Sequence, residues 1–465
     1  MVREMSQIDK DDTLIVSAGY KPQLNRSLGL FASFAIPFSL ISITTGIFAN
    51  FGFVLSKAGP FGFWTWPLVS FGLILVALTF AEMAGRIPLT GSVYNWNNKL
   101  AGPFIGWMAG WLALSNYTIG TAAITTTMLP VLGIMLGHDV DPQTGACIAS
   151  ALIVIQMIIN MYGMKITSHT NVVSVIAEIV SIVVLSILVI VAVINKGHFN
   201  FDLLTTIPAS PRPYLLGFLM SALIGSWCLT GFESSADVSE ETINATRITP
   251  KGIMFSILCS AFIGFAFIVV MTLAIPDVAT ISAAPYPLAA ISTYYLGASA
   301  TNVFLGFALI AMFSCSMVCM TAGSRVLFAM ARDGRFIASA TMSKISTHHV
   351  PKAPLVLITV MSICFTFMTD STTSLYGAAT VCAAIYYLAT VVGFGLGAKK
   401  LPATPTFSLG CWHWPVVVLA TLWAIAEICI LTIPEEFHAV AIATAGVLVV
   451  GLVIYVAVGR KTTPL

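Results

Sequence analysis

The stretch Leu229-Thr230-Gly231-Phe232-Glu233-Ser234-Ser235 places a glycine, hydroxyl groups and a carboxylate towards the end of an apolar segment. A second carboxylate, that of Asp237, follows within about one turn. Carboxylates cannot face lipid at a tolerable cost, and many transporters bind solute where a helix is interrupted near the middle of the membrane. The stretch therefore predicts an interrupted membrane helix that takes part in solute binding.

A similar stretch, Ser42-Ile43-Thr44-Thr45-Gly46-Ile47, lies in the first apolar segment, after Pro37. In both stretches Thr-Gly precedes a bulky apolar residue, and Gly46 and Gly231 are 185 residues apart. This echo fits two five-helix repeats whose first helices are interrupted at equivalent places. Small residues also serve helix packing in lipid, so packing and interruption are both open interpretations of the first stretch.

The composition indicates that lipid is the solvent. Of 465 residues, 58% are hydrophobic and 9% are charged, and the mean hydropathy is +0.94. A soluble protein needs roughly a quarter of its residues charged. The basic residues are spread singly along the chain, which argues against a nucleic-acid partner. The nine cysteines lie mostly in apolar stretches, where cysteine behaves as a small hydrophobe, so neither a disulfide framework nor a metal site is expected.

Twelve segments have the roughly 20 mostly apolar residues that a membrane-spanning helix needs. They lie near 30–55, 62–84, 104–134, 146–163, 170–194, 213–236, 252–275, 299–330, 354–369, 374–397, 412–433 and 438–458. The sequence therefore predicts an all-α polytopic membrane protein with twelve transmembrane helices, in which helices 1 and 6 are discontinuous. The longest loop is expected at 276–298.

The basic residues also predict the orientation, because cytoplasmic loops collect Lys and Arg. With both termini inside, 18 of the 21 basic residues fall on the cytoplasmic side, and Lys57, Lys196 and Arg212 are the exceptions. We therefore expect a multi-pass protein of the cell membrane with cytoplasmic tails at 1–27 and 459–465. The charged residues before the first apolar segment do not resemble a cleavable signal peptide.

The two interrupted stretches suggest where a solute would bind. Free N–H groups at the start of a half-helix favour an anion, which suits a substrate carboxylate at the first stretch. Carbonyls of residues 227–230 can accept from an ammonium group, and an aromatic face attracts a cation. A tryptophan in a span is also commonly a packing residue, and this alternative stays open. The candidate binding residues are Thr44, Thr45, Gly46, Ile47, Asn116, Trp227, Thr230, Gly231, Phe232 and Glu233, with Tyr386 and Tyr387 as further polar groups of a cavity.

Two more carboxylates lie inside spans. Glu178 is in the middle of the fifth segment with no basic residue near it in the sequence. An ionised carboxylate is expensive there, so Glu178 is the candidate for proton coupling; a protonated, purely structural glutamate is the alternative. Glu427 lies in the eleventh segment, and we expect a structural role or a place at an oligomer interface.

Charged residues of both signs gather at the expected cytoplasmic ends of the helices. We predict that they form ion pairs that close an inner gate, without touching substrate. The candidates are Glu82, Arg86, Glu240, Arg247, Arg325 and Asp333, together with Glu241 and Arg332.

Several motifs resemble those of amino acid–polyamine–organocation permeases, in the same order and over nearly the whole chain. Residues 81–94 (AEMAGRIPLTGSVY) resemble the loop after the family's second helix, and residues 101–111 (AGPFIGWMAGW) its third helix. Residues 231–253 contain GFESSADVSEET, NATR and PKGI, which are similar to the sixth helix and its inner loop. Ser324-Arg325 and Ala331-Arg332-Asp333-Gly334 resemble the end of helix eight. The Ser-Glu-Glu-Thr element is most similar to the branch of amino acid, 4-aminobutyrate and choline permeases.

The resemblance implies the leucine-transporter fold. Its core would span 28–397 as two inverted five-helix repeats, about 28–194 and 213–397, followed by helices eleven and twelve at 412–458. Many relatives carry a lysine near the place of Glu178, which implies that Glu178 substitutes for it and cycles a proton. Two departures, Thr44-Thr45-Gly46 at the first break and Glu233 with Asp237 in the sixth helix, point to a different or more cationic substrate.

The expected function is secondary transport of an amino acid or related organic amine, coupled to H⁺, without a cofactor and with the lipid bilayer as surroundings. Sodium-coupled or exchange transport of a cationic amine, such as choline, a polyamine or a cationic vitamin, is the first alternative. A channel and a membrane-embedded enzyme are less favoured, because we find neither a repeated pore motif nor a nucleophile, metal cluster or donor-binding loop. The oligomeric state does not follow from the sequence.

Overall fold

The computed structural model describes residues 7–196, 200–205, 207, 214–368, 372–402 and 406–460. The ends of both predicted tails, residues 1–6 and 461–465, lie outside these ranges, and so does Arg212. The described residues form helices joined by short turns, with one isolated bridge between Leu28 and Thr242. The all-α prediction is therefore confirmed. The α-helices are α1 (Gln7–Ser17), α2 (Leu30–Ile41), α3 (Ile43–Ala58), α4 (Thr65–Arg86), α5 (Ser92–Leu100), α6 (Pro103–Leu136), α7 (Pro142–Met161), α8 (Met164–Lys196), α9 (Tyr214–Met220), α10 (Leu223–Cys228), α11 (Ser234–Asp237), α12 (Ala245–Leu273), α13 (Val278–Ala283), α14 (Pro287–Arg332), α15 (Ser339–Met342), α16 (Lys352–Met368), α17 (Thr372–Gly397), α18 (His413–Ile430) and α19 (His438–Ile454).

Ten helical segments in the described ranges are long and apolar enough to cross a membrane. Each coincides with one of the twelve predicted segments. The sixth and ninth predicted segments correspond to shorter apolar helices, Tyr214–Cys228 and Lys352–Met368. These helices are apolar on all sides because they lie against lipid or against one another rather than against water.

The predicted loop at 276–298 is largely helical, so this expectation was wrong. Helix α13 lies within it, and α14 begins at Pro287 and is kinked at Gly297, whose φ of +80° and ψ of 167° are not helical. A proline fits the first turn of a helix, where its missing N–H is not needed. For this reason Pro287 starts a helix instead of marking a loop.

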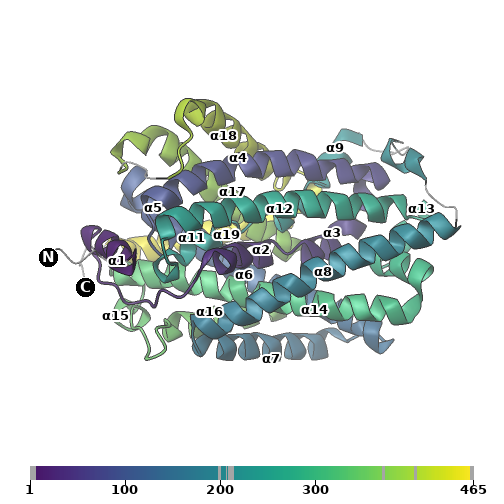
Figure 1. Cartoon of the computed structure of the whole chain (residues 1–465), viewed down its shortest axis with the longest axis horizontal. Helices are drawn as coiled ribbons and strands as arrows, with labels where there is room; N and C mark the ends of the chain where they lie inside the picture. Colours follow the sequence, from purple (N-terminus) through teal and green to yellow (C-terminus); the bar gives the residue numbers. More distant parts are fainter. Residues whose placement is uncertain are drawn as a thin grey trace.

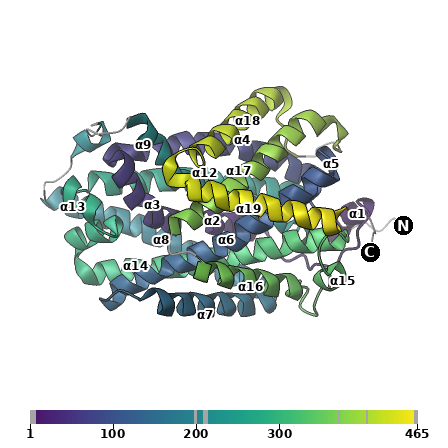
Figure 2. The same cartoon turned by 180° about the vertical axis from the view of Figure 1, so that it is seen from behind.

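The helices run roughly along the long axis of the molecule (Figure 1). Helices α1, α5 and α15 lie at one end, and α9 and α13 lie at the other, as the reverse view also shows (Figure 2). Inside the bundle, α6 packs against α14 and α17, and α12 packs against α4 and α2. The last two helices lie outside this core: α18 packs on α17 and α4, and α19 packs on α17 and α6.

Two irregular backbone segments meet in the centre of the bundle. Ser42 separates α2 from α3 with φ +35° and ψ 89°. Gly231, with φ +105°, lies between α10 and α11. A Cβ atom on Gly231 would come within 1.8 Å of Leu40 Cδ2, and one on Gly46 within 2.5 Å of Cys228 Cβ. Both glycines are therefore required for the close approach of the two segments.

Candidate functional site

The carboxylate of Glu178 lies at the N-terminus of α3. Glu178 comes from α8, its side chain is 1% exposed, and its Oε1 accepts hydrogen bonds of 3.0 Å from Ser42 Oγ and from the backbone N–H of Thr44. An anion is favoured at this position, because the first N–H groups of a helix have no partner inside the helix. The sequence predicted that a substrate carboxylate would bind here, whereas in this conformation a side chain of the protein occupies the place.

The other N–H groups predicted to cradle a carboxylate have partners within their own helix. The N–H of Thr45 donates to Ser42 Oγ at 3.4 Å, and that of Gly46 donates to Ser42 O at 3.0 Å. The side chains of Thr44, Thr45 and Ile47 are buried. Within the described structure Thr44 Oγ1 has no hydrogen-bond partner. Binding of a substrate carboxylate at this cradle requires Glu178 or Ser42 to release the N–H of Thr44 or Thr45.

Two thiols contact the carbonyl end of α2. Cys228 Sγ donates to Ile41 O at 3.4 Å, and Cys315 Sγ donates to Leu40 O at 3.2 Å. Carbonyls at a helix C-terminus otherwise have no partner, and weak thiol donors supply one here. Sequence reasoning treated both cysteines as small apolar residues. Nothing in the sequence brings them near residues 40 and 41, because they come from distant helices.

The carboxylate of Glu233 is surrounded by tyrosine hydroxyls. Tyr386 and Tyr387, from α17, donate to it at 2.5 and 2.7 Å, and the hydroxyl of Tyr117, from α6, lies 3.3 Å away. Tyr387 also accepts a 3.2 Å hydrogen bond from the N–H of Gly231. Glu233 is 1% exposed, so its carboxyl oxygens contact the tyrosine hydroxyls inside the bundle. The two predicted tyrosines thus contact the predicted carboxylate.

Tyr117 joins Glu233 to Asp237. Its hydroxyl donates to Asp237 Oδ2 at 2.6 Å, and Asp237 Oδ1 accepts a 2.7 Å hydrogen bond from Ser92 at the start of α5. A polar chain therefore runs from the sixth-segment interruption towards the end of the molecule that carries α5. Asn116, the predicted neighbour, donates instead to Ala379 O at 2.8 Å and fastens α6 to α17.

Trp227 lies near a cavity at the end of the molecule opposite α5. The cavity has a volume of about 410 Å³ and is lined by Phe48 and Gly52 of α3, Thr127 of α6 and Tyr376 of α17, among others. The ring of Tyr376 packs on that of Trp227 with centroids 4.8 Å apart. Trp227 is half-buried and contacts the cavity's lining through Tyr376.

The remaining predicted binding residues of the sixth segment are engaged in packing. Phe232 stacks on Tyr387 at 5.2 Å and meets the edge of Phe80 at 5.6 Å. Thr230 Oγ1 donates to Ser226 O at 2.6 Å. These contacts fix the backbone on both sides of Gly231.

Several ion pairs lie at the end of the bundle near α5. Arg325 forms two hydrogen bonds, of 3.0 and 3.1 Å, with Glu241, and both side chains are 1% exposed. Arg332 binds both oxygens of Glu240 at 2.9 and 3.0 Å. Arg86 pairs with Glu82 at 2.5 Å. Arg247 is exposed and forms no ion pair within the described ranges, so the structure does not bring it into this cluster.

The N-terminal segment contributes to the same end. Asp333 accepts hydrogen bonds of 2.9 Å from Tyr20 and 2.7 Å from Tyr94. Burial and the neighbouring Asp333 carboxylate hold the pKa of the Tyr20 hydroxyl well above its usual value. Arg332 also lies over the Tyr20 ring, 3.9 Å from its centroid. The sequence analysis missed both tyrosines, because it searched this region for charges alone.

A protein-family model described as amino acid permease matches residues 28–458. The chain belongs to this amino acid permease family. The resemblance read from the motifs is therefore confirmed, and the protein is a multi-pass membrane transporter, not an enzyme.

Three relatives illustrate the range of the family. The permease is 25% identical to the amino-acid permease BAT1 of Arabidopsis thaliana, over 96% of this chain and 94% of that protein. It is 27% identical to the branched-chain amino acid permease BcaP of Bacillus subtilis over 74% of each chain. It is also 24% identical to the thiamine transporter thi9 of Schizosaccharomyces pombe, over 76% of this chain and 68% of that protein.

Proposed function

We propose that this permease is a secondary active transporter that takes up an amino acid or a related organic amine together with protons, by alternating access. The observation that carries this proposal is the hydrogen bond between buried Glu178 and the N–H of Thr44 at the start of α3. The names of its relatives support an amino acid as substrate. The proposed location is the cell membrane, with both termini in the cytoplasm.

The proposed architecture has twelve spans in the leucine-transporter arrangement. In it, α2 and α3 together form the discontinuous helix 1, and α9, α10 and α11 form the discontinuous helix 6. These two helices hold equivalent places in two inverted repeats. The mutual contact of Gly46 with Cys228 and of Gly231 with Leu40 supports this pairing. The outer position of α18 and α19 agrees with two trailing helices.

Competition at Thr44 gives a physical basis for coupling. An ionised Glu178 forms charge-assisted hydrogen bonds with Ser42 and with the N–H of Thr44, and these are stronger than neutral ones. Proton binding weakens them and frees the N–H of Thr44 for another anion. A substrate carboxylate would then bind at the start of α3 only after Glu178 has taken up a proton. Substrate and proton would thus cross together.

A cationic amine is the second candidate substrate, with sodium-coupled transport or exchange as its alternative mechanism. The carboxylate of Glu233 at the interrupted segment and the ring of Trp227 favour it, since both attract a cation. The similarity to a protein named as a thiamine transporter also supports this candidate.

A thermal-shift screen followed by uptake tests these proposals. The purified permease would be screened against amino acids, polyamines, 4-aminobutyrate, choline and thiamine, because a ligand of the folded state raises Tm by mass action. Each stabilising compound would then be tested in proteoliposomes with an imposed proton or sodium gradient. We expect saturable uptake driven by an inward proton gradient. Uptake that follows the sodium gradient and ignores the proton gradient would reject proton coupling.

A further inference from the structure

A third buried carboxylate, that of Glu427, lies outside the site described above. Glu427 belongs to α18 and is 2% exposed, so it faces the bundle, and the expected place at an oligomer interface is not supported. Its Oε1 atom has no hydrogen-bond partner within the described ranges. An intramembrane carboxylate without a cation beside it is expensive, and packing alone gives no reason to keep one there.

Two polar groups face this carboxylate. They are Ser226 on α10 and Trp423, one turn earlier on α18. Their Oγ and Nε1 atoms are also buried and lack a hydrogen-bond partner in the described part of the chain. Trp423 is held in place against α4, where a Cβ atom on Gly72 would come within 2.0 Å of its ring. Three unsatisfied polar groups therefore meet between α10 and α18.

These groups can serve both protonation states of Glu427. An ionised carboxylate accepts from the Ser226 hydroxyl and from the Trp423 N–H, whereas a protonated carboxyl donates to Ser226 and still accepts from Trp423. Neither bond is formed in the present conformation. The bond to Trp423 lies within α18, whereas the bond to Ser226 joins α18 to α10 and depends on the position of α10. Because α10 runs directly into the interruption at Gly231, the protonation state of Glu427 can bias the position of that segment.

The titratable surroundings of Glu427 are sparse. From α17, Tyr387 faces it, the same residue that donates to Glu233. On α4, Glu82 and Arg86 pair with each other at the far end of the helix. On the α19 side, Glu436 pairs with Lys57 at 3.2 Å near the surface. Among the described residues, no cation is placed to neutralise Glu427.

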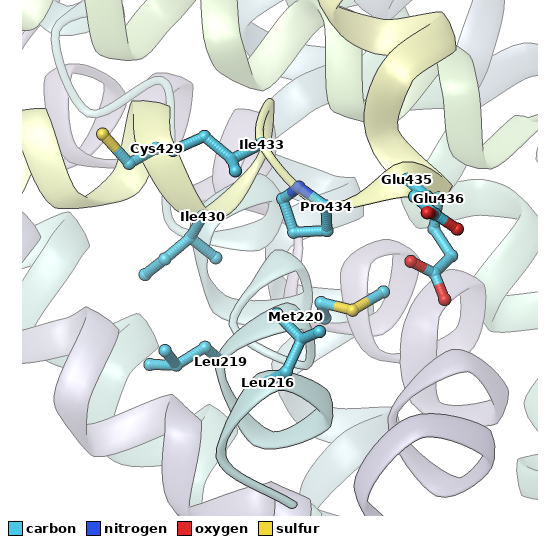
Figure 3. A pocket seen from close by; sticks show the side chains of 9 residues that line it. All are labelled: Leu216, Leu219, Met220, Cys429, Ile430, Ile433, Pro434, Glu435 and Glu436. Carbon is cyan, nitrogen blue, oxygen red and sulfur yellow. The ribbon is translucent and has the colours of Figure 1, made fainter. Parts of the chain in front are cut away.

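A pocket lies at the end of the molecule that carries α9, and its lining comes within one helical turn of Glu427 in the sequence. It has a volume of about 610 Å³ and lies between α9 and the turn after α18 (Figure 3). Leu219, Met220 and Ile430 line it, and Glu435 and Glu436 lie at one edge (Figure 3). Ile430 is one helical turn from Glu427, so about one turn of α18 separates the pocket from the carboxylate.

We propose that Glu427, Ser226 and Trp423 form a second proton-binding site, which exchanges protons with the extracellular side through this pocket and sets the position of α10. The bound proton forms a neutral carboxyl on Glu427 and leaves by the same route, without any covalent step. This inference rests on the proposed transport function and on the outward orientation of the α9 end, but not on the role of Glu178.

Infrared difference spectroscopy tests proton binding directly on the purified protein. A change of pH should produce a protonated-carboxyl component that is lost in Glu427→Gln and retained in Glu178→Gln, beside a Glu178 component that shows the opposite pattern. Thr444→Val is the matched control, because Thr444 is likewise buried with an unpaired hydroxyl, and it should retain both components. An identical carboxyl difference spectrum in wild type and Glu427→Gln would overturn the proposal whether or not the permease is proton-coupled.

Uptake in proteoliposomes tests coupling to transport. Glu427→Gln removes one titrating group. We therefore expect the limiting slope of log uptake rate against external pH to fall by about one, so that the rate changes about tenfold less per pH unit. Ser226→Ala, which keeps the carboxylate, should shift this pH profile, and Ile430→Trp, which fills the pocket, should slow its response to a jump in external pH. An unchanged pH profile in all three variants would assign Glu427 a structural role. Loss of concentrative uptake in Glu178→Gln alone would leave the proposed function intact and reject the second site.

Discussion

The Oε1 atom of Glu178 accepts a 3.0 Å hydrogen bond from the backbone N–H of Thr44. This contact joins α8 to the first turn of α3, and it places a carboxylate where the helix N-terminus favours negative charge. A movement of α3 away from α8 would break it. The pair therefore connects the charge on one side chain to the position of a central helix segment.

Replacing Glu178 by Gln should uncouple transport from the proton gradient. The amide is a neutral isostere, so it imitates the protonated side chain and cannot release a proton. We expect concentrative uptake driven by an inward proton gradient to be abolished in proteoliposomes. Substrate binding in detergent should survive, with its pH dependence flattened.

The control for this variant is counterflow with equal pH on both sides, which needs binding and conformational change but no proton gradient. Glu178→Gln should retain counterflow. Full accumulation of substrate by the variant under a proton gradient would remove Glu178 from the coupling mechanism and support a structural role.

Substrate selectivity should depend on Glu233 and Trp227. A substrate amine gains a charge-assisted contact from Glu233 and an aromatic face from Trp227, and losing such a contact costs about 1.5–3 kcal/mol. Glu233→Gln and Trp227→Ala should each weaken substrate binding by at least about tenfold, as measured by isothermal titration calorimetry. Trp227→Phe should lose less, because a ring still packs on Tyr376. Unchanged affinity in both of the first two variants would place the site elsewhere.

The costly groups of this site could be predicted from the sequence, but their partners could not. Glu178 and Glu233 can be recognised in the sequence because a carboxylate inside a membrane span is energetically costly and therefore indicates a specific role. The sequence analysis predicts Asn116 at the site and does not name its neighbour Tyr117. Residues that are neighbours in sequence point about 100° apart on a helix, and the sequence does not fix which one faces the interior. In the structure Asn116 bonds a carbonyl of α17, and Tyr117 lies beside Glu233.

In the fold, too, features with a local sequence signal could be predicted, whereas contacts between distant helices could not. Hydropathy located the helices, and the motifs identified the family, because both signals are local in the sequence. The contacts of Cys228 and Cys315 with the end of α2, and the exposure of Arg247, depend on how distant helices pack. Such contacts have no local signal.

Gly231→Ala should destabilise the permease or prevent its folding. The new Cβ would lie 1.8 Å from Leu40 Cδ2, and overpacking typically costs about 1–3 kcal/mol. The φ of +105° adds backbone strain for a residue with a side chain. Gly446→Ala is the matched control, since no atom lies within 4 Å of the Cβ position there. A melting temperature of Gly231→Ala within error of wild type would contradict the close packing of the two interrupted segments.

The orientation can be tested with single cysteines and a membrane-impermeant thiol reagent on intact cells. Cysteines at Gly137 and Pro434 should react from outside, and cysteines at Lys99 and Ser343 should react only after permeabilisation. The four exposed native cysteines, Cys147, Cys364, Cys411 and Cys429, would first be replaced by serine. Protection of Gly137→Cys from outside, with labelling after permeabilisation, would overturn the assigned topology.

The Arg325–Glu241 pair should hold the end of the bundle near α5 closed. Both side chains are 1% exposed, and removing one partner of a buried ion pair costs about 3–5 kcal/mol because the other charge is left unpaired. Arg325→Ala should therefore favour conformations in which this end is open to water. A cysteine at Ala322, one turn deeper on α14 and 1% exposed, reports the opening. In inside-out vesicles its labelling should be at least about tenfold faster in Arg325→Ala than in wild type. Arg247→Ala, which removes an exposed arginine without an ion pair in the described ranges, should leave the labelling rate unchanged. If Arg325→Ala and Arg247→Ala label at the same rate as wild type, the pair does not control access from this end.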